Sequence, residues 1–147
     1  MKIAIGSDHR GYRLKEQLKE YMKEKGIEFV DFGTDSEGTA DYPDYAIPVG
    51  EAIVKKECDM GVLICYTGIG MSIAANKVRG IRAAHVVAPV YAKMARQHND
   101  ANVLCLPGGF MTKESAIECL ELFISTEFEG ERHKRRVDKI ITYENSH

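Results

Sequence analysis

The sequence lacks several features that would indicate particular classes of protein. It has no tryptophan, four prolines and a net charge of only −2. This charge gives no reason to expect a nucleic acid or an anionic membrane as a partner. The longest stretch without a charged residue, 60–76, is interrupted by glycines and a threonine, so it is too polar for a membrane span. The apolar residues 3–5 are too few for a signal peptide.

The cysteines also lack the spacing of a metal site or a redox motif. There are four of them and no CxxC pair, and no closely spaced Cys and His residues suggest a zinc site. Without a secretion signal, we expect reduced thiols and a cytoplasmic protein. A chain of 147 residues, 44% of them hydrophobic, is enough for one domain with its own core, which we expect to span residues 1–147.

Apolar segments typical of strands alternate with amphipathic segments typical of helices. Strands are predicted at 2–7, 27–32, 60–64, 81–87 and 103–106, and helices at 10–25, 44–56, 71–77 and 89–97, after the Thr112 cap and over 127–139. This alternation predicts an α/β fold, a Rossmann-like, doubly wound, five-stranded parallel sheet with helices on both faces and a C-terminal helical tail. The segment 33–43 is predicted as a polar loop.

Polar clusters follow three of the predicted strands. They are Asp8-His9, Cys65 to Gly70, and Pro107-Gly108-Gly109. Ligands of such sheets bind at the carboxyl ends of the strands, so we expect these clusters to meet in one site.

The glycine-rich turn after the third strand fits no common nucleotide motif. Ile73 stands where a dinucleotide fingerprint needs its third glycine, and the P-loop GK[ST] is missing. A thiol phosphatase would need an arginine where Met71 stands, and Ala74 replaces the last glycine of an esterase elbow. Cys65 could be a buried core cysteine. Its place before a helix N-terminus, beside backbone N–H groups, favours a catalytic thiol instead.

The histidines and the basic tail each allow two interpretations. His98, at the end of a predicted helix, could simply be a surface residue. His9 is a better candidate for a functional residue, because the carboxylate of the neighbouring Asp8 could orient its imidazole. Arg132 and Arg136 share a helix face and could clamp a dianion, or simply face solvent.

Taken together, these segments resemble the ribose-5-phosphate isomerase B family, which includes the galactose-6-phosphate isomerase subunits. The resemblance extends from residue 6 to residue 136. The matching segments are Gly6-Ser7-Asp8-His9 with Gly11, Asp41-Tyr42-Pro43, Cys65 with Thr67-Gly68-Ile69-Gly70, Ala74-Ala75-Asn76-Lys77, Gly80-Ile81-Arg82-Ala83, Arg96-Gln97-His98-Asn99-Asp100 with Asn102-Val103-Leu104, and Arg132-His133 with Arg136.

The resemblance implies a metal-independent and cofactor-free aldose–ketose isomerisation of ribose 5-phosphate to ribulose 5-phosphate through an enediolate, a step of the pentose phosphate pathway. Cys65 would be the base, because the position of the glutamate that another branch of the family uses lies in 74–76, which contains no acid. The implied catalytic residues are Cys65, Thr67, His98 and Asp8. The implied substrate-binding residues are His9, Tyr42, Tyr66, Gly68, Ile69, Gly70, Asn99, Arg132 and Arg136.

The resemblance also implies a homodimer or homotetramer whose active site is shared between subunits. Allose 6-phosphate or galactose 6-phosphate are alternative substrates, and a non-catalytic sugar-phosphate-binding module is an alternative function.

Two positions depart from the family pattern. Tyr66 stands where a glycine is usual, and Gly109 where many members have a phosphate-binding arginine. Arg10, where a small residue is common, is a candidate to replace that charge.

Overall fold

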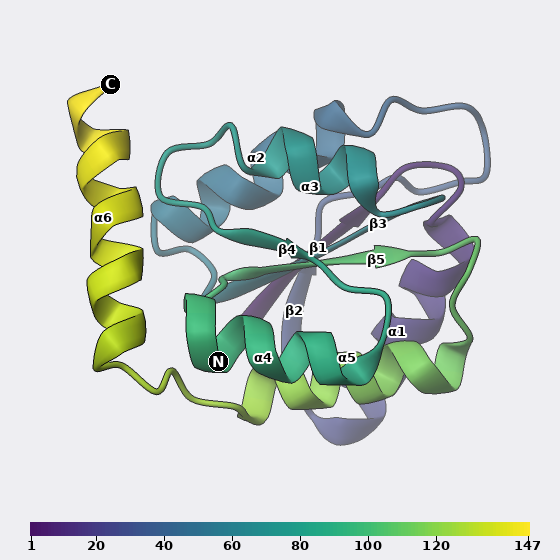
Figure 1. Cartoon of the computed structure of the whole chain (residues 1–147). Coiled ribbons are helices and arrows are strands. Elements are labelled where there is room, and N and C mark those ends of the chain that lie inside the picture. The colour runs from purple at the N-terminus through teal and green to yellow at the C-terminus, as the bar shows by residue number, and fades with distance from the viewer.

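Five parallel strands form one sheet in the order β2-β1-β3-β5-β4 (Figure 1). The computed structural model describes residues 1–147. The strands are β1 (Lys2–Ser7), β2 (Glu28–Asp31), β3 (Met60–Cys65), β4 (Ala83–His85) and β5 (Val103–Pro107). The predicted doubly wound parallel sheet is therefore confirmed.

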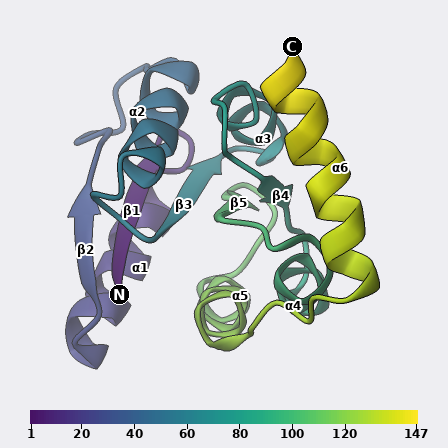
Figure 2. The same cartoon turned by 90° about the vertical axis from the view of Figure 1, so that its left-hand side faces the viewer.

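Helices cover both faces of the sheet. Buried residues of α1 (Tyr12–Lys25), α4 (Pro89–Asn99) and α5 (Lys113–Ser125) form one core cluster with the strands. Buried residues of α2 (Pro43–Val54) and α3 (Ile69–Ala75) form the other. The last helix, α6 (Arg132–Ser146), runs past the edge of the sheet beside β4 and α4 (Figure 2). No helix has the length and apolar character needed to cross a membrane.

Alternation along β3 decides which core each of its side chains joins. Val62 and Ile64 pack in the cluster of α1, α4 and α5, whereas Leu63 and Cys65 pack in the cluster of α2 and α3. This follows from the period of two in a strand. It directs the side chain of Cys65 to the face of the sheet that carries α3.

Most predicted elements differ from the structure by one or two residues at an end; the edge strand is shortened at both ends, and the tail helix starts later. The edge strand β4 is only three residues long, instead of 81–87. The tail helix begins at Arg132, not at residue 127, because Gly130 has a φ of 74° and Glu131 a φ of 51°, which a helix does not allow. The segment before it is held to α4 by a hydrogen bond from the Glu129 N–H to the Gln97 carbonyl (3.0 Å).

The start of α1 lies almost in contact with the end of β3. A Cβ atom on Gly11 would be 2.3 Å from the carbonyl oxygen of Ile64. The Gly11 N–H also donates to the Asp8 carboxylate (3.1 Å). Glycine at position 11 therefore sets the distance between the loop after β1 and the strand that carries Cys65.

We expect Gly11→Ala to destabilise the protein by about 3 kcal/mol, because the rigid backbone of β3 must move to admit the methyl group. Gly38→Ala is the matched control, since its new Cβ would meet only the Ser36 hydroxyl at 3.4 Å. Urea unfolding of both variants measures the difference. Equal stability of the two variants would contradict this account of Gly11.

Candidate active site

The loops after β1, β3 and β5 meet at the carboxyl edge of the sheet, as the sequence predicted. The Asp8 N–H donates to the Ile64 carbonyl (3.2 Å), and the Gly108 N–H to the Cys65 carbonyl (2.8 Å). A third hydrogen bond joins the Gly109 N–H to the Tyr66 carbonyl (2.9 Å). The loops are thus joined directly by their backbones, which fixes the side chains that they carry.

Cys65 is the last residue of β3 and is 5% exposed. The other three cysteines are buried as well, and none forms a disulfide. Burial raises the pKa of the Cys58 and Cys105 thiols, and that of Cys119 to about 11. These three thiols therefore stay protonated at neutral pH and are poor bases.

The turn after Cys65 presents backbone donors. Gly68 has a φ of 79°, and the N–H groups of Gly68 and Gly70 donate to no acceptor in the chain. The Ile69 N–H donates to the hydroxyl of Thr67 (3.2 Å), which places this hydroxyl at the turn. Free N–H groups beside a thiol can stabilise an oxygen on which negative charge develops.

Asp8 is buried at the same edge, with 7% of its surface exposed. Its Oδ1 accepts hydrogen bonds from the N–H groups of Arg10 (2.9 Å) and Gly11 (3.1 Å). Burial raises the pKa of the Asp8 carboxyl, although both hydrogen bonds and the charges of His9 and Arg10 oppose the increase. The carboxylate is thus held in a fixed position at a cost in desolvation.

The predicted polar loop, 33–43, contacts His9 and carries Tyr42 to the site. Nδ1 of His9 lies 3.2 Å from both the N and the O of Ala40, so its Nε2 atom is free for a ligand. The ring of Tyr42 lies against Gly70, where a Cβ atom would be 2.8 Å from Tyr42 Cε1. Tyr42 directly precedes α2 as its N-cap residue, and its ring is next to the turn that follows Cys65.

The remaining predicted residues lie on the opposite side of the molecule. In Figure 1 the arrowheads of β3 and β5 point to the right, whereas α6 stands at the left. His98 and Asn99 end α4, which returns the chain to the amino edge of the sheet, and the exposed Arg132 and Arg136 lie in the first turns of α6. One chain therefore does not bring these four residues to Cys65.

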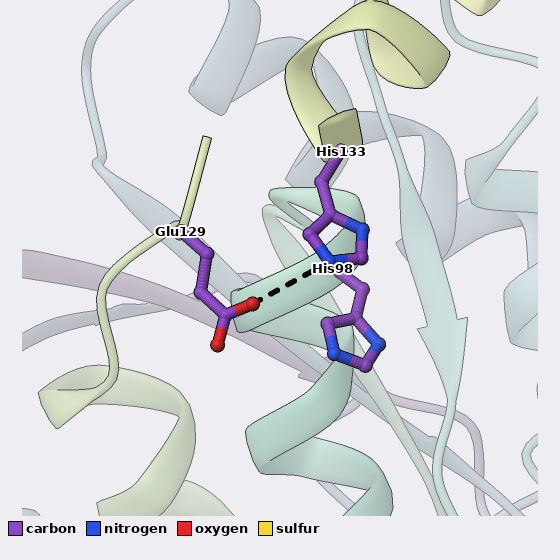
Figure 3. A group of neighbouring side chains, drawn as sticks. All are labelled: His98, Glu129 and His133. Carbon is purple, nitrogen blue, oxygen red and sulfur yellow. Dashed lines mark ion pairs between the residues drawn. The ribbon is translucent and has the colours of Figure 1, made fainter. Parts of the chain in front are cut away.

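His98 packs against a residue to which the sequence assigned no role (Figure 3). Its ring stacks on that of His133, with centroids 4.3 Å apart and planes 10° apart. Burial and the charge of Arg132 lower the pKa of His133, so its contact with Glu129 (3.4 Å) becomes an ion pair only on protonation. The stacking depends on the packing of α6 against α4, which no local sequence signal reveals.

The ligand atoms of His98, Glu129 and His133 lie within 4.8 Å of one another, as a metal site requires. The lone pair of an imidazole nitrogen lies in the plane of its ring. Because the two rings are stacked nearly parallel, their lone pairs do not converge on one point. The arrangement therefore fits a stacked imidazole pair better than a metal centre.

The sequence also did not reveal that a histidine of β4 contacts the glycine-rich turn after Cys65. His85 of β4 places its Nε2 atom 2.8 Å from the carbonyl oxygen of Thr67. A Cβ atom on Gly68 would be 3.0 Å from the same imidazole ring. His85 thus supports the glycine turn from β4.

This geometry is that of a doubly wound α/β protein with its ligand site at the carboxyl edge of the sheet. The sequence profile of the Ribose/Galactose Isomerase family matches residues 3–140. Ribose-5-phosphate isomerase B of Escherichia coli (strain K12) is 43% identical over 143 residues, which cover 97% of this chain and 96% of that protein.

Two solved structures have the same fold. Ribose-5-phosphate isomerase B of Clostridium thermocellum has a TM-score of 0.97 at 46% identity, with 99% of both chains covered. The enzyme of Mycoplasma genitalium, with bound ribulose-5-phosphate, has a TM-score of 0.95 at 45% identity, with 99% of this chain and 97% of that one covered. The protein is therefore an α/β isomerase. It belongs to the Ribose/Galactose Isomerase family.

The raised pKa of Asp8 predicts a pH-dependent effect on stability. A carboxyl whose pKa is higher in the folded state favours folding below its unfolded pKa, and this contribution is lost as the pH rises through the folded value. Asp8→Asn keeps the Oδ1 acceptor and removes the charge. We expect its free energy of unfolding, relative to the wild type, to rise from about pH 4 toward neutrality. Urea unfolding across this range tests the trend, and a relative decline with pH would contradict it.

Proposed function

We propose that the chain interconverts ribose 5-phosphate and ribulose 5-phosphate through an enediolate, with Cys65 as the base. The observation that carries the proposal is the position of Cys65 beside the unpaired N–H groups of Gly68 and Gly70. The names of the Escherichia coli relative and of the ribulose-5-phosphate complex from Mycoplasma genitalium support the same substrate.

The reaction moves a proton between two neighbouring carbons. Cys65 removes the proton from C2 of the open-chain aldose and returns it at C1, while a second proton passes from O2 to O1 of the enediolate, so that the carbonyl moves from C1 to C2. A hydrogen next to a carbonyl is a weak acid, so the negative charge that forms on the oxygen needs fixed donors. The hydroxyl of Thr67, which the Ile69 N–H holds in place, and the unpaired N–H groups of Gly68 and Gly70 serve this purpose. Asp8 accepts hydrogen bonds from the sugar while His98 helps to open the furanose ring.

The remaining residues bind the two ends of the substrate. His9, Arg132 and Arg136 bind the phosphate, and Tyr42 and Asn99 contact sugar hydroxyls. The Tyr42 ring lies against Gly70 and the Tyr66 ring against Gly109, next to the turn that follows Cys65. The names of the relatives favour a five-carbon substrate over allose 6-phosphate or galactose 6-phosphate.

A second copy of the chain completes the site, because His98, Asn99 and the arginines of α6 lie away from Cys65 in their own chain. Apolar side chains are exposed on the three helices around the edge strand β4 (Figure 2), and contact between copies there would bury them. They are Ile69, Ile73, Val90, Tyr91, Met94, Ile140 and Tyr143. We propose a homodimer, alone or within a tetramer, in a cytoplasm that keeps the four thiols reduced.

Cys65→Ala should lower kcat for ribose 5-phosphate by roughly a thousandfold, as expected for loss of a general base. The matched control is Cys58→Ala, which removes a buried thiol that lies outside the site. Ribulose 5-phosphate formation is measured with EDTA present, and with allose 6-phosphate and galactose 6-phosphate alongside. Turnover of a hexose phosphate alone would change the substrate. Binding without turnover of any sugar would instead indicate a binding module.

Two inactive variants should restore activity when they are combined. Cys65→Ala and His98→Asn damage different halves of a shared site, so a mixed dimer keeps one intact site. Refolding equal amounts together should give about a quarter of the wild-type activity, since half of the dimers are mixed and each of these has one working site. Cys65→Ala mixed with Thr67→Ala is the control, because both changes damage the same half. Failure of the first pair to recover, or a monomer by ultracentrifugation, would contradict the shared site.

A further inference from the structure

A cavity of about 380 Å³ lies beside the loop that follows Cys65. Seven residues line it: His9, Arg10, Arg13, Glu37, Tyr66, Gly108 and Gly109. Its only acid, Glu37, lies 3.4 Å from Arg13. Arg10 forms no ion pair within the chain. The cavity therefore faces one guanidinium whose charge is not matched by an acid.

This guanidinium is held in place without being neutralised. Its carbon lies 4.5 Å from the centroid of the Tyr66 ring. The ring in turn packs edge to face against Phe110, with centroids 5.0 Å apart. A cation on an aromatic face keeps the N–H groups in the guanidinium plane free, and these fit the oxygens of a phosphate.

Tyr66 also prevents the loop after β5 from carrying a cationic side chain at position 109. A Cβ atom on Gly109 would lie 2.3 Å from Cε1 of Tyr66. Position 109 therefore has no room for a side chain while the ring is there. The same ring that excludes a cation from the loop after β5 supports the cation of Arg10 from the loop after β1.

We propose that Arg10 binds the phosphate monoester of the substrate, and that Tyr66 is the positioning residue that holds Arg10 for this contact. This inference rests on the proposed function, because it places the phosphate end of the sugar in the cavity beside His9. A dianionic phosphate suits the site better than a carboxylate, since it gains from both the guanidinium and the imidazole.

The test measures the Kd of inorganic phosphate by calorimetry and the KM of ribose 5-phosphate. Arg10→Ala should raise both by roughly tenfold or more, the usual effect of losing a hydrogen bond to a charged group, and change kcat little. Arg13→Ala is the matched control, because Arg13 lines the same cavity but is paired with Glu37. An Arg10→Ala variant with unchanged phosphate affinity and KM would overturn the proposal while leaving the isomerase function intact.

The role of Tyr66 has its own signature. Tyr66→Leu should weaken phosphate binding by about threefold, as expected for loss of a solvent-exposed cation–π contact, whereas Tyr66→Phe keeps the aromatic face and the affinity. In the Arg10→Ala background, Tyr66→Leu should have no further effect on phosphate binding. A full additional loss in the double variant would overturn the positioning role.

The two proposals can fail separately. Phosphate binding that depends on Arg10 in a protein with no isomerase activity would support the anion site and reject the function. Thermal unfolding of each variant identifies any loss of binding that arises from misfolding.

Discussion

All five strands of the sheet run in the same direction, and this constraint decides where every functional residue can lie. Each helix must return the chain to the amino edge before the next strand begins. Residues directly after strands, such as Asp8 and Cys65, therefore gather at one edge. Residues at the ends of helices, such as His98, gather at the other. The proposed site residues are consequently divided between the two edges, and this is why we propose that a second copy of the chain supplies those that lie away from Cys65.

At the carboxyl edge of the sheet, close contacts at glycines position the loops and the side chains that they carry. Gly11 lets α1 begin directly against the Ile64 carbonyl, and Gly109 admits the ring of Tyr66. Neither glycine could be replaced without moving a neighbour. The departures at positions 66 and 109 are thus one structural feature and not two, because the aromatic ring requires the glycine. Any change at one of these positions must be interpreted together with the other.

Local patterns in the sequence were sufficient to predict much of this fold. The apolar strands, the Thr112 cap, whose hydroxyl accepts the Ser115 N–H, and the meeting of the three loops were all predictable from the sequence. The stacking of His98 on His133 was not, because it depends on how α6 packs against α4. The predicted start of the tail helix at residue 127 was also wrong, since the charge-rich sequence continues through Gly130 while the backbone of Gly130 and Glu131 leaves the helical region.

The reactivity proposed for Cys65 is a property of its position more than of its residue type. Cys105 lies on the adjacent strand, opposite Leu63 and therefore two residues deeper in the sheet. Burial raises the pKa of its thiol, so it cannot serve as a base. Cys65, at the last position of β3, is followed at once by a turn with unpaired N–H groups. The same side chain thus changes from an inert core residue to a candidate base over the length of two residues, because only the strand end meets backbone donors.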